Sequence, residues 1–317
     1  MISISVVGTG KIVGEVLEML RQERLDIKVN SIYAHSNVER AGQLADTYNI
    51  DKVYTDYDEL LREDLSDMVY IANVNDQHFP FALKALQASR HVIIEKPICL
   101  KAEELDTLIA LARDRHLYIF EAMTIRYMPN FIRLKEDVQR LGKIRIVEAN
   151  YSQYSSRYDQ YRQGIVLPAF DPEHAGGALL DLNIYNITQV ISLFGPPESK
   201  HYYPNRGFNG IDTSGVMIMR YPDFTAVCTA SKDADGDSHI TIEGERGYIH
   251  VKGVTSVCQE YELHLRGEQP VVVKEERSVH RLAYEFRRFA EIFEHRDYDA
   301  MTAMLEQTRA AIEGYTF

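Results

Sequence analysis

Two short segments of this sequence carry side chains suited to polarising a carbonyl group and moving a proton. In the first, the branched apolar run Val92-Ile93-Ile94 is followed directly by Glu95 and Lys96. The run is typical of a buried strand in a parallel sheet, and Pro97 ends it because proline has no N–H to donate. The charged pair is therefore expected at the carboxyl end of a buried strand, where open α/β sheets bind their ligands.

The second segment follows Gly176 and Gly177, which permit a close approach at the start of a helix expected to run to about Phe194. Asp181 and Tyr185 are four residues apart, so they share one face of that helix. The spacing leaves two interpretations open. One is a structural hydrogen bond between buried side chains; the other is an orienting carboxylate beside a phenol that donates and accepts a proton.

These residue types suit one another in a hydride transfer. Addition of a hydride to a carbonyl develops an alkoxide, which needs a cationic or hydrogen-bonding partner and then a proton. Lys96 supplies the charge, and the phenol of Tyr185 becomes a stronger acid when an ammonium group stands beside it. A nicotinamide cofactor would supply the hydride, so the protein has only to position the substrate, polarise it and move a proton.

The N-terminal residues have the pattern of a dinucleotide-binding turn. Ile2–Val7 is predicted to form a strand, the glycines of Gly8-Thr9-Gly10 break it, and apolar residues at helical spacing begin at Ile12. Such glycines let the backbone approach a pyrophosphate, and the following helix N-terminus supplies N–H groups. Val13 occupies the place of the usual third glycine, so a simple tight turn is the alternative.

The next predicted strand, at about residues 27–34, ends in a loop without the acidic residue that usually holds the ribose hydroxyls of NAD. His35, Ser36 and Arg40 lie there instead, and all three can donate hydrogen bonds. They favour a 2′-phosphate, and hence NADP over NAD. The other interpretation is that they are solvated loop residues.

The organisation of the chain predicts two domains. Strands alternating with helices up to about residue 121 predict a parallel, doubly wound sheet. Residues 144–265 then contain mostly alternating strands with few helices between them, and helical periodicity returns over about 280–314. We therefore expect an α/β nucleotide-binding domain over residues 1–121 and an α+β domain with a mostly antiparallel sheet over residues 122–317.

The composition narrows the classes of function. The chain has 317 residues and a formal net charge of −12, which argues against binding to nucleic acid or to an anionic membrane surface. No apolar run approaches the roughly 18 residues of a membrane span, and no basic, apolar leader precedes the first strand. Cys99, Cys228 and Cys258 are far apart, which predicts buried thiols in a reducing compartment and no metal site. The cytoplasm is the expected location.

Five blocks, in this order along nearly the whole chain, resemble the Gfo/Idh/MocA oxidoreductases, of the glucose-fructose oxidoreductase and inositol dehydrogenase type. The blocks are Gly8-Thr9-Gly10-Lys11, Ile71-Ala72-Asn73-Val74-Asn75 with His78, Glu95-Lys96-Pro97, Glu121-Ala122, and Gly176 through Tyr185. Many members have His where Tyr185 stands. Tyrosine at this position resembles the branch of trans-dihydrodiol and xylose dehydrogenases.

The resemblance implies an N-terminal Rossmann domain and a C-terminal, open-faced sheet domain that binds substrate and forms homodimers or homotetramers. It also implies that Lys96 bridges the nicotinamide ribose region and the substrate hydroxyl, with Asp181 and Tyr185 completing the catalytic set. The residues expected at the cofactor, besides His35, Ser36 and Arg40, are Gly8, Thr9, Gly10, Lys11, Ile12, Ala72, Asn73, Asn75, His78, Glu95, Lys96 and Glu121.

Two departures from the family pattern bear on the pocket. Asn73-Val74-Asn75 stands where Thr-Pro-Asn is usual, and Asn183 replaces a glycine, where it would narrow the nicotinamide pocket or donate a hydrogen bond to substrate. The position of His78 at the start of a predicted helix favours a capping or packing role over catalysis. Candidate residues of the substrate mouth are Arg126, Tyr127, Arg157, Tyr158, Arg162 and Asn183.

These observations lead to one hypothesis and one alternative. The hypothesis is an NAD(P)-dependent dehydrogenase or reductase acting on CH–OH groups of a sugar, polyol or cyclic diol. In it, Lys96 polarises the substrate, Tyr185 transfers the proton, Asp181 orients them and Glu95 gives local support. The alternative is a regulatory or binding protein of the same fold that senses NAD(P) without catalysis. Such a sensor has no chemical need for the Lys96, Asp181 and Tyr185 set.

Overall fold

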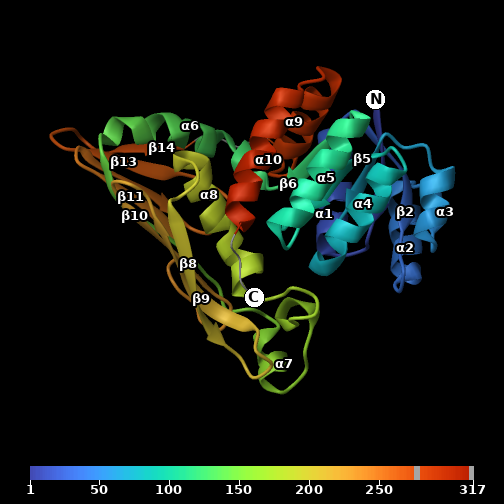
Figure 1. Ribbon diagram of the computed structural model, residues 1–317, viewed down its shortest axis with the longest axis horizontal. Coiled ribbons are helices and arrows are strands. Elements are labelled where there is room, and N and C mark those ends of the chain that lie inside the picture. The colour runs from blue at the N-terminus through green and yellow to red at the C-terminus, as the bar shows by residue number, and fades with distance from the viewer. Residues whose placement is uncertain (275–278, 314–317) are drawn as a thin grey trace. The chain divides into compact units, whose positions relative to one another are not determined.

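The computed structural model describes residues 1–274 and 279–313 of the chain. Of these, residues 1–122 and 279–306 form one compact unit, and residues 123–274 and 307–313 form the other. Each unit is built around a sheet of its own (Figure 1).

The first unit contains a parallel six-stranded sheet in the order β3-β2-β1-β4-β5-β6, as the predicted doubly wound sheet requires. Its strands are β1 (Ile2–Val7), β2 (Ile27–Tyr33), β3 (Lys52–Tyr54), β4 (Met68–Ile71), β5 (His91–Glu95) and β6 (Ile119–Ala122). The helices that alternate with them are α1 (Lys11–Glu23), α2 (Val38–Tyr48), α3 (Tyr57–Glu63), α4 (His78–Gln87) and α5 (Ala102–Arg115).

The central strands of this sheet form because their side chains are apolar on both faces. Every residue of β4 is buried, and so is the run Val92–Ile94 of β5, as expected for parallel strands covered by helices on both sides. The register aligns Ile71 of β4 with both Val7 of β1 and Ile94 of β5. The carboxyl ends of β1, β4 and β5 therefore meet at one edge of the sheet.

Two C-terminal helices also belong to the first unit: α9 (Ala283–Glu294), and α10 (Tyr298–Ile312) up to residue 306. Phe286 and Phe289 of α9 pack against Tyr70 and Phe120 of the sheet, with ring centroids 5.7 and 4.7 Å apart. The sequence analysis assigned the whole chain after residue 121 to one domain. The structure differs because these helices bury their aromatic face against the first sheet.

The second unit contains an eight-stranded sheet in the order β14-β13-β12-β11-β7-β10-β9-β8. Its neighbouring strands are antiparallel, apart from the parallel pair of β7 and β10. The strands are β7 (Ile144–Ser152), β8 (Ser199–Arg206), β9 (Asp212–Arg220), β10 (Thr225–Ser231), β11 (His239–Gly244), β12 (Gly247–Lys252), β13 (Tyr261–Leu265) and β14 (Val271–Val273). The mostly antiparallel second sheet is thus confirmed.

Helices lie along one face of this sheet and leave the other open. In Figure 1, α6 (Pro129–Val138) and α8 (Ile184–Phe194) run along the covered face, and the short α7 (Tyr158–Arg162) lies in the loop after β7. Buried and partly exposed residues alternate along β9, as in a strand covered on one side. Apolar side chains are present on the open face too. They include Ile146, which is 43% exposed, and its neighbour two strands away, Tyr248, which is 41% exposed.

Candidate active site

In the turn between β1 and α1, Gly8 is packed closely against Ala72, whereas Gly10 faces open space. Gly8 has a φ of 111°, and a Cβ there would lie 2.5 Å from the carbonyl oxygen of Ala72. Gly10 is the N-cap of α1, and a Cβ there would meet nothing within 4 Å. No side chain caps this helix N-terminus, and its first turn contains no acidic residue. The free N–H groups and the open space fit a pyrophosphate.

The missing third glycine has a structural explanation. Val13 is fully buried in the first turn of α1, where it contributes to the core of the unit. The helix and sheet therefore pack around a valine side chain, and the turn keeps its shape without a third glycine. Thr9 and Ile12 are partly exposed and Lys11 is exposed beside this turn, as the cofactor assignment of residues 8–12 requires.

His78 is the first residue of α4 and lies inside the first unit. Its ring is fully buried, with Nδ1 2.7 Å from the carbonyl oxygen of Pro97 and Nε2 3.3 Å from that of Asn73. Burial lowers the pKa of His78, against the opposing effect of these two carbonyl oxygens. The ring lies between the ends of β4 and β5. The prediction of a packing role is the one that this geometry supports. His78 supports the Lys96–Pro97 peptide, which is cis.

Asn73 has one feature that points to a bound molecule. Its Oδ1 atom is buried and accepts no hydrogen bond from any residue in the described part of the chain. Buried acceptors are nearly always satisfied, and a ribose hydroxyl at the carboxyl end of β4 would supply a donor. Asn75 is partly exposed in the same loop. Ala72, by contrast, is buried against Gly8.

Glu95 is held by a residue that the sequence analysis did not select. Tyr70 of β4 donates a hydrogen bond of 2.7 Å to Glu95 Oε1. Burial raises the pKa of Glu95, against the opposing effects of Tyr70 and the adjacent Lys96. Lys96 itself is half-buried directly after β5. Glu121, aligned with Ile94 on β6, is 1% exposed and lies inside the unit.

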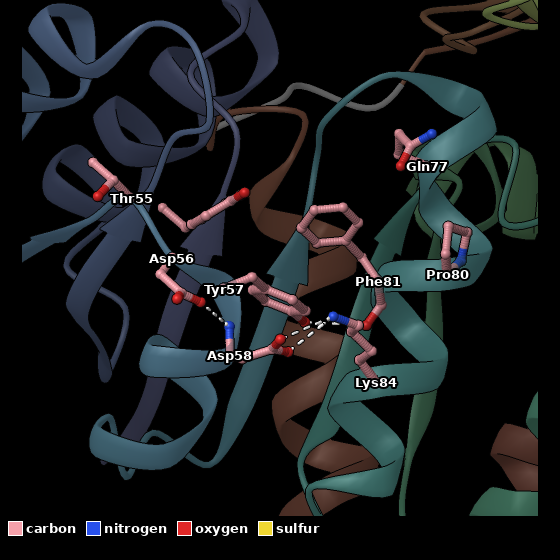
Figure 2. Close-up of a pocket in the computed structure, with 9 residues that line it drawn as sticks. Thr55, Asp56, Tyr57, Asp58, Gln77, Pro80, Phe81 and Lys84 are labelled. Atoms are coloured by element: carbon pink, nitrogen blue, oxygen red, sulfur yellow. Dashed lines mark hydrogen bonds and ion pairs between the residues drawn. The ribbon is translucent and has the colours of Figure 1, made fainter.

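A pocket of about 450 Å³ lies beyond the carboxyl ends of β2 and β3 (Figure 2). Tyr57 and Phe81 pack against each other in its lining, with ring centroids 4.5 Å apart, and Tyr33 completes an aromatic cluster. Lys84 forms an ion pair with Asp58 at its rim. Aromatic side chains beside polar and charged groups suit a planar ring system that carries polar atoms.

The predicted phosphate donors are placed next to this pocket in sequence. Tyr33, the last residue of β2, lines it. His35, Ser36 and Arg40 follow within seven residues, and all three are exposed. Arg40 donates to Gln43 over 3.3 Å, so its guanidinium lies at the surface of the first turn of α2.

In the second unit, Asp181 lies in a π-helical turn, Leu179–Asn183, that continues into α8. The sequence analysis predicted a regular α-helix here. The structure differs because Asp212 accepts the N–H of Leu179 over 2.6 Å and holds the first turn. Asp181 and Tyr185 remain partly exposed, and the ring of Tyr185 lies 6.0 Å from that of Tyr151. Wide π turns are frequent at functional sites.

Asn183 lies at the start of α8, packed against β10. Its side chain is fully buried, and Nδ2 donates to the carbonyl oxygen of Cys228 in β10 over 3.0 Å. The neighbouring Asn186 donates to Asn183 Oδ1 and to the carbonyl oxygen of Thr229. These amides fasten the start of α8 to β10. The side chain of Asn183 is thus bound to the sheet, and its expected contact with substrate stays a prediction.

A lysine that the sequence analysis missed contacts Asp181. Lys232 is 2% exposed, and its Nζ lies 2.9 Å from Asp181 Oδ2 and 2.6 Å from the carbonyl oxygen of Ala169. The signal was present in the sequence. Ala226, Cys228 and Ala230 face the covered side of β10, and a period of two places Lys232 on that side as well.

The candidate residues of the substrate mouth differ in exposure. Arg126 is buried and donates to Thr308 Oγ1 over 2.7 Å, which places it inside the unit. Tyr127 is half-buried. Around α7, Arg157 and Arg162 are exposed, and Tyr158 is half-buried with its ring stacked on Tyr161.

Residues 1–274 and 279–313 show neither a metal-binding cluster nor a membrane-spanning helix. They contain no group of three or more His, Cys, Asp or Glu side chains arranged to hold a metal ion. No helix in these ranges combines the length and the apolar character needed to cross a membrane.

Models of two family domains match this sequence. The model described as "Oxidoreductase family, NAD-binding Rossmann fold" matches residues 2–122, and the GFO/IDH/MocA C-terminal domain matches residues 132–250.

Three similar proteins set these matches in context. The chain is 31% identical to an uncharacterized oxidoreductase, YgjR, of Escherichia coli, over 92% of this chain and 88% of that one. It is 34% identical to the scyllo-inositol 2-dehydrogenase (NADP(+)) IolU of Bacillus subtilis, over 78% and 75% of the two chains. In fold, it resembles the 3-ketoreductase KijD10 of Actinomadura kijaniata, solved with NADP and TDP-benzene, with a TM-score of 0.83, 20% identity, and coverage of 98% and 95%.

Proposed function

This chain belongs to the GFO/IDH/MocA oxidoreductase family, and we propose that it is an NAD(P)-dependent dehydrogenase or reductase acting on a sugar, polyol or cyclic diol. The observation that carries this proposal is the position of Lys96. It lies directly after β5, on the sheet edge that also holds the open turn at Gly10. An ammonium group there would lie beside a dinucleotide bound at this edge of the sheet. The similarity to a scyllo-inositol dehydrogenase supports the substrate class.

Each candidate catalytic residue has a distinct role in the proposed reaction. When bound, the nicotinamide supplies or accepts the hydride. The Lys96 ammonium stabilises negative charge as it develops on the substrate oxygen. Tyr185 donates the proton to that oxygen in reduction and takes it in oxidation. Asp181 orients the polar groups around the substrate hydroxyl, and Glu95, held by Tyr70, fixes the backbone next to Lys96.

We propose NADP as the preferred cofactor. The aromatic pocket at Tyr57 and Phe81 would hold the adenine, and the turn at Gly10 would hold the pyrophosphate. His35, Ser36 and Arg40 would then contact a 2′-phosphate, since they follow the strand that ends at the pocket. A similar protein whose name specifies NADP(+) supports this preference.

We further propose that the chain forms homodimers or homotetramers through the open face of its larger sheet. Ile146, Val216, Ile218, Val227 and Tyr248 are partly or largely exposed on this face. Apolar side chains gathered on a flat sheet face are typical of a covered interface. Light scattering of the purified protein tests this assembly: a monomer at micromolar concentration would contradict it.

The function is tested by binding first and turnover second. Titration of the protein with NADPH and with NADH, followed by nicotinamide fluorescence, is expected to give tighter binding of NADPH. Turnover is then measured with NADP+ and a panel of inositols, aldoses and cyclic diols, and with NADPH and the matching carbonyl compounds. Turnover of at least one class is expected. Binding of neither cofactor contradicts the proposal, and cofactor binding without any turnover favours the sensor alternative.

A further inference from the structure

We propose that Lys232 is a positioning residue for Asp181, and that it connects this carboxylate to the loop around Phe170. The inference rests on the proposed function, in which Asp181 orients groups at the substrate. None of the five family blocks includes Lys232, which lies one residue beyond β10.

The ammonium group of Lys232 is fully engaged within the second unit. One N–H faces Asp181 Oδ2 at 2.9 Å, and another donates to the carbonyl oxygen of Ala169 at 2.6 Å. The ring of Phe170 lies beneath the charge, with its centroid 4.6 Å away. Burying a lysine is costly unless its charge is paired and hydrogen-bonded. The contacts that offset the cost of burying the Lys232 charge come from Asp181 and from the loop at residues 169–170.

The main chain of Lys232 is as firmly held as its side chain. Its N–H donates to the carbonyl oxygen of Thr213 in β9 over 2.8 Å, and its own carbonyl oxygen accepts the N–H of Ser155 over 2.9 Å. The ammonium group is therefore fixed to the sheet. Asp181 keeps 39% of its side chain exposed, so an ion pair with a fixed cation sets the direction of a carboxylate that still reaches the surface.

The loop that carries Ala169 and Phe170 packs directly on the segment before Asp181. The carbonyl oxygen of Ala169 also accepts the N–H of Gly177 over 3.1 Å. A Cβ on Gly176 would lie 2.6 Å from the carbonyl oxygen of Pro168, so only glycine permits this approach. A displacement of the loop would thus move the partners of Lys232 and the backbone before Asp181 together.

An aromatic stack extends this connection to the surface. Phe170 stacks on Tyr161, and Tyr161 stacks on Phe208, with centroid separations of 4.9 and 4.5 Å. Phe208 is 64% exposed. A substrate that contacts this loop therefore has a packed path to the partners of Asp181.

Other titratable groups pack near the same lysine. Asp212 of β9 is buried and accepts hydrogen bonds from Leu179 and from Tyr202, each 2.6 Å long. Burial raises the pKa of Asp212, partly opposed by Tyr202 and by Lys232. Asp233 follows Lys232 and is bound by the hydroxyls of Thr213 and Ser231. Asp181 differs from these two carboxylates because a direct ion pair joins it to Lys232.

The test compares Lys232→Gln and Lys232→Met with the wild-type protein, using the substrate found in the turnover panel. Each variant is expected to lower kcat about 10- to 100-fold, because a misplaced orienting group costs on this order. KM and the Kd for NADPH should change less than about threefold. The acidic limb of the pH–rate profile should move to higher pH, because Asp181 loses its cationic neighbour. Lys232→Arg, which keeps the charge, should restore the position of that limb.

Lys200→Met is the matched control. Lys200 lies on β8 in the same unit, and its Nζ also donates to two backbone carbonyl oxygens, those of Ala310 and Ala311. This variant should lose thermal stability but keep the wild-type pH–rate profile. If Lys200→Met lowers kcat and shifts the profile as Lys232→Met does, Lys232 has only a structural role. A wild-type profile and kcat in Lys232→Gln would overturn the proposal as well.

A crystal structure of Lys232→Gln separates failure of this inference from failure of the proposed function. If the wild-type protein turns over nothing in the panel, the proposed function fails, and the orientation of Asp181 still decides the inference. In the wild-type protein the Asp181 carboxylate faces Lys232, which in turn contacts Ala169. Rotation of this carboxylate away from that direction, with the backbone of Leu179–Asn183 unchanged, would support the inference. An Asp181 in the wild-type position would overturn it.

Discussion

Tyr70 and Glu95 are joined by a 2.7 Å hydrogen bond across neighbouring strands. The register of β4 and β5 aligns Tyr70 with Ile93, and Glu95 lies two residues further on, so both side chains are on the same face. Burial raises the pKa of Glu95 and the Tyr70 hydroxyl opposes this rise. The phenol therefore stabilises the charged form of a carboxyl group whose pKa is raised by burial.

Tyr70→Phe should destabilise the protein more at pH 8 than at pH 5. A carboxyl group whose folded pKa lies above its unfolded value contributes stability that is present below the unfolded pKa, about 4.3 for glutamate, and is lost as pH rises through the folded pKa. Removal of the hydroxyl raises the pKa of Glu95 further and so increases this loss. The free energy of unfolding in urea should fall by an additional ~1 kcal/mol at pH 8.

Tyr57→Phe is the control for this experiment. The Tyr57 hydroxyl donates to the carbonyl oxygen of Phe81 over 3.1 Å, and a carbonyl does not titrate. Its loss should lower the free energy of unfolding equally at the two pH values. A Tyr70→Phe variant that shows the same pH-independent loss would contradict the role assigned to Glu95.

Gly8→Ala and Gly10→Ala should separate stability from cofactor binding. Alanine at residue 8 would adopt a φ of 111° with its Cβ 2.5 Å from the Ala72 carbonyl oxygen, which should cost on the order of 2–4 kcal/mol of unfolding free energy. Alanine at residue 10 has open space, so the fold should lose less than about 1 kcal/mol. Calorimetric titration should show an NADPH Kd about tenfold weaker for Gly10→Ala, because the methyl group occupies the expected pyrophosphate position.

Arg40→Ala tests the proposed preference for NADP. Loss of a charge-assisted hydrogen bond to the 2′-phosphate should weaken NADPH binding about tenfold and leave NADH binding unchanged. Lys28→Ala is the control, since Lys28 is an exposed cation at the other end of β2 that pairs with Asp51. Equal weakening of NADPH and NADH by Arg40→Ala would show that this residue does not read the phosphate.

Lys96→Met tests the catalytic assignment. Removal of the ammonium group should lower turnover by about 10³-fold or more, while fluorescence titration should give a cofactor Kd within about threefold of the wild-type value. Lys52→Met removes an exposed cation at the start of β3 and should leave both quantities unchanged. Normal turnover by Lys96→Met would rule out the proposed role.

The first sheet was predictable because its signals are local. The apolar run at residues 92–94 and the glycine break at Gly8 are properties of neighbouring residues, and the structure forms β5 and the β1–α1 turn at those places. The partner of Glu95 was not predictable in this way. Tyr70 is 25 residues distant in sequence, and only the register of two strands brings the phenol to the carboxylate.

Several features of the second unit could not be predicted from local sequence patterns. The strand β14 has three residues after Pro270, too few to show alternation. The parallel pairing of β7 with β10 depends on a crossover that no residue type encodes. Around Asp181, Asp212 of the distant strand β9 holds the π turn, and Lys232, which follows β10, holds the carboxylate. The spacing of residues along one helix cannot predict partners that come from distant strands.

The packing of α9 on the first sheet also determines when that sheet can be completed during synthesis. Tyr70 and Phe120 are made early, but their aromatic partners Phe286 and Phe289 leave the ribosome only after the whole second sheet. Until then, the nascent first unit exposes an apolar surface to the cell. The chain therefore cannot finish its nucleotide-binding half first, and a fragment ending at residue 122 should be prone to aggregation.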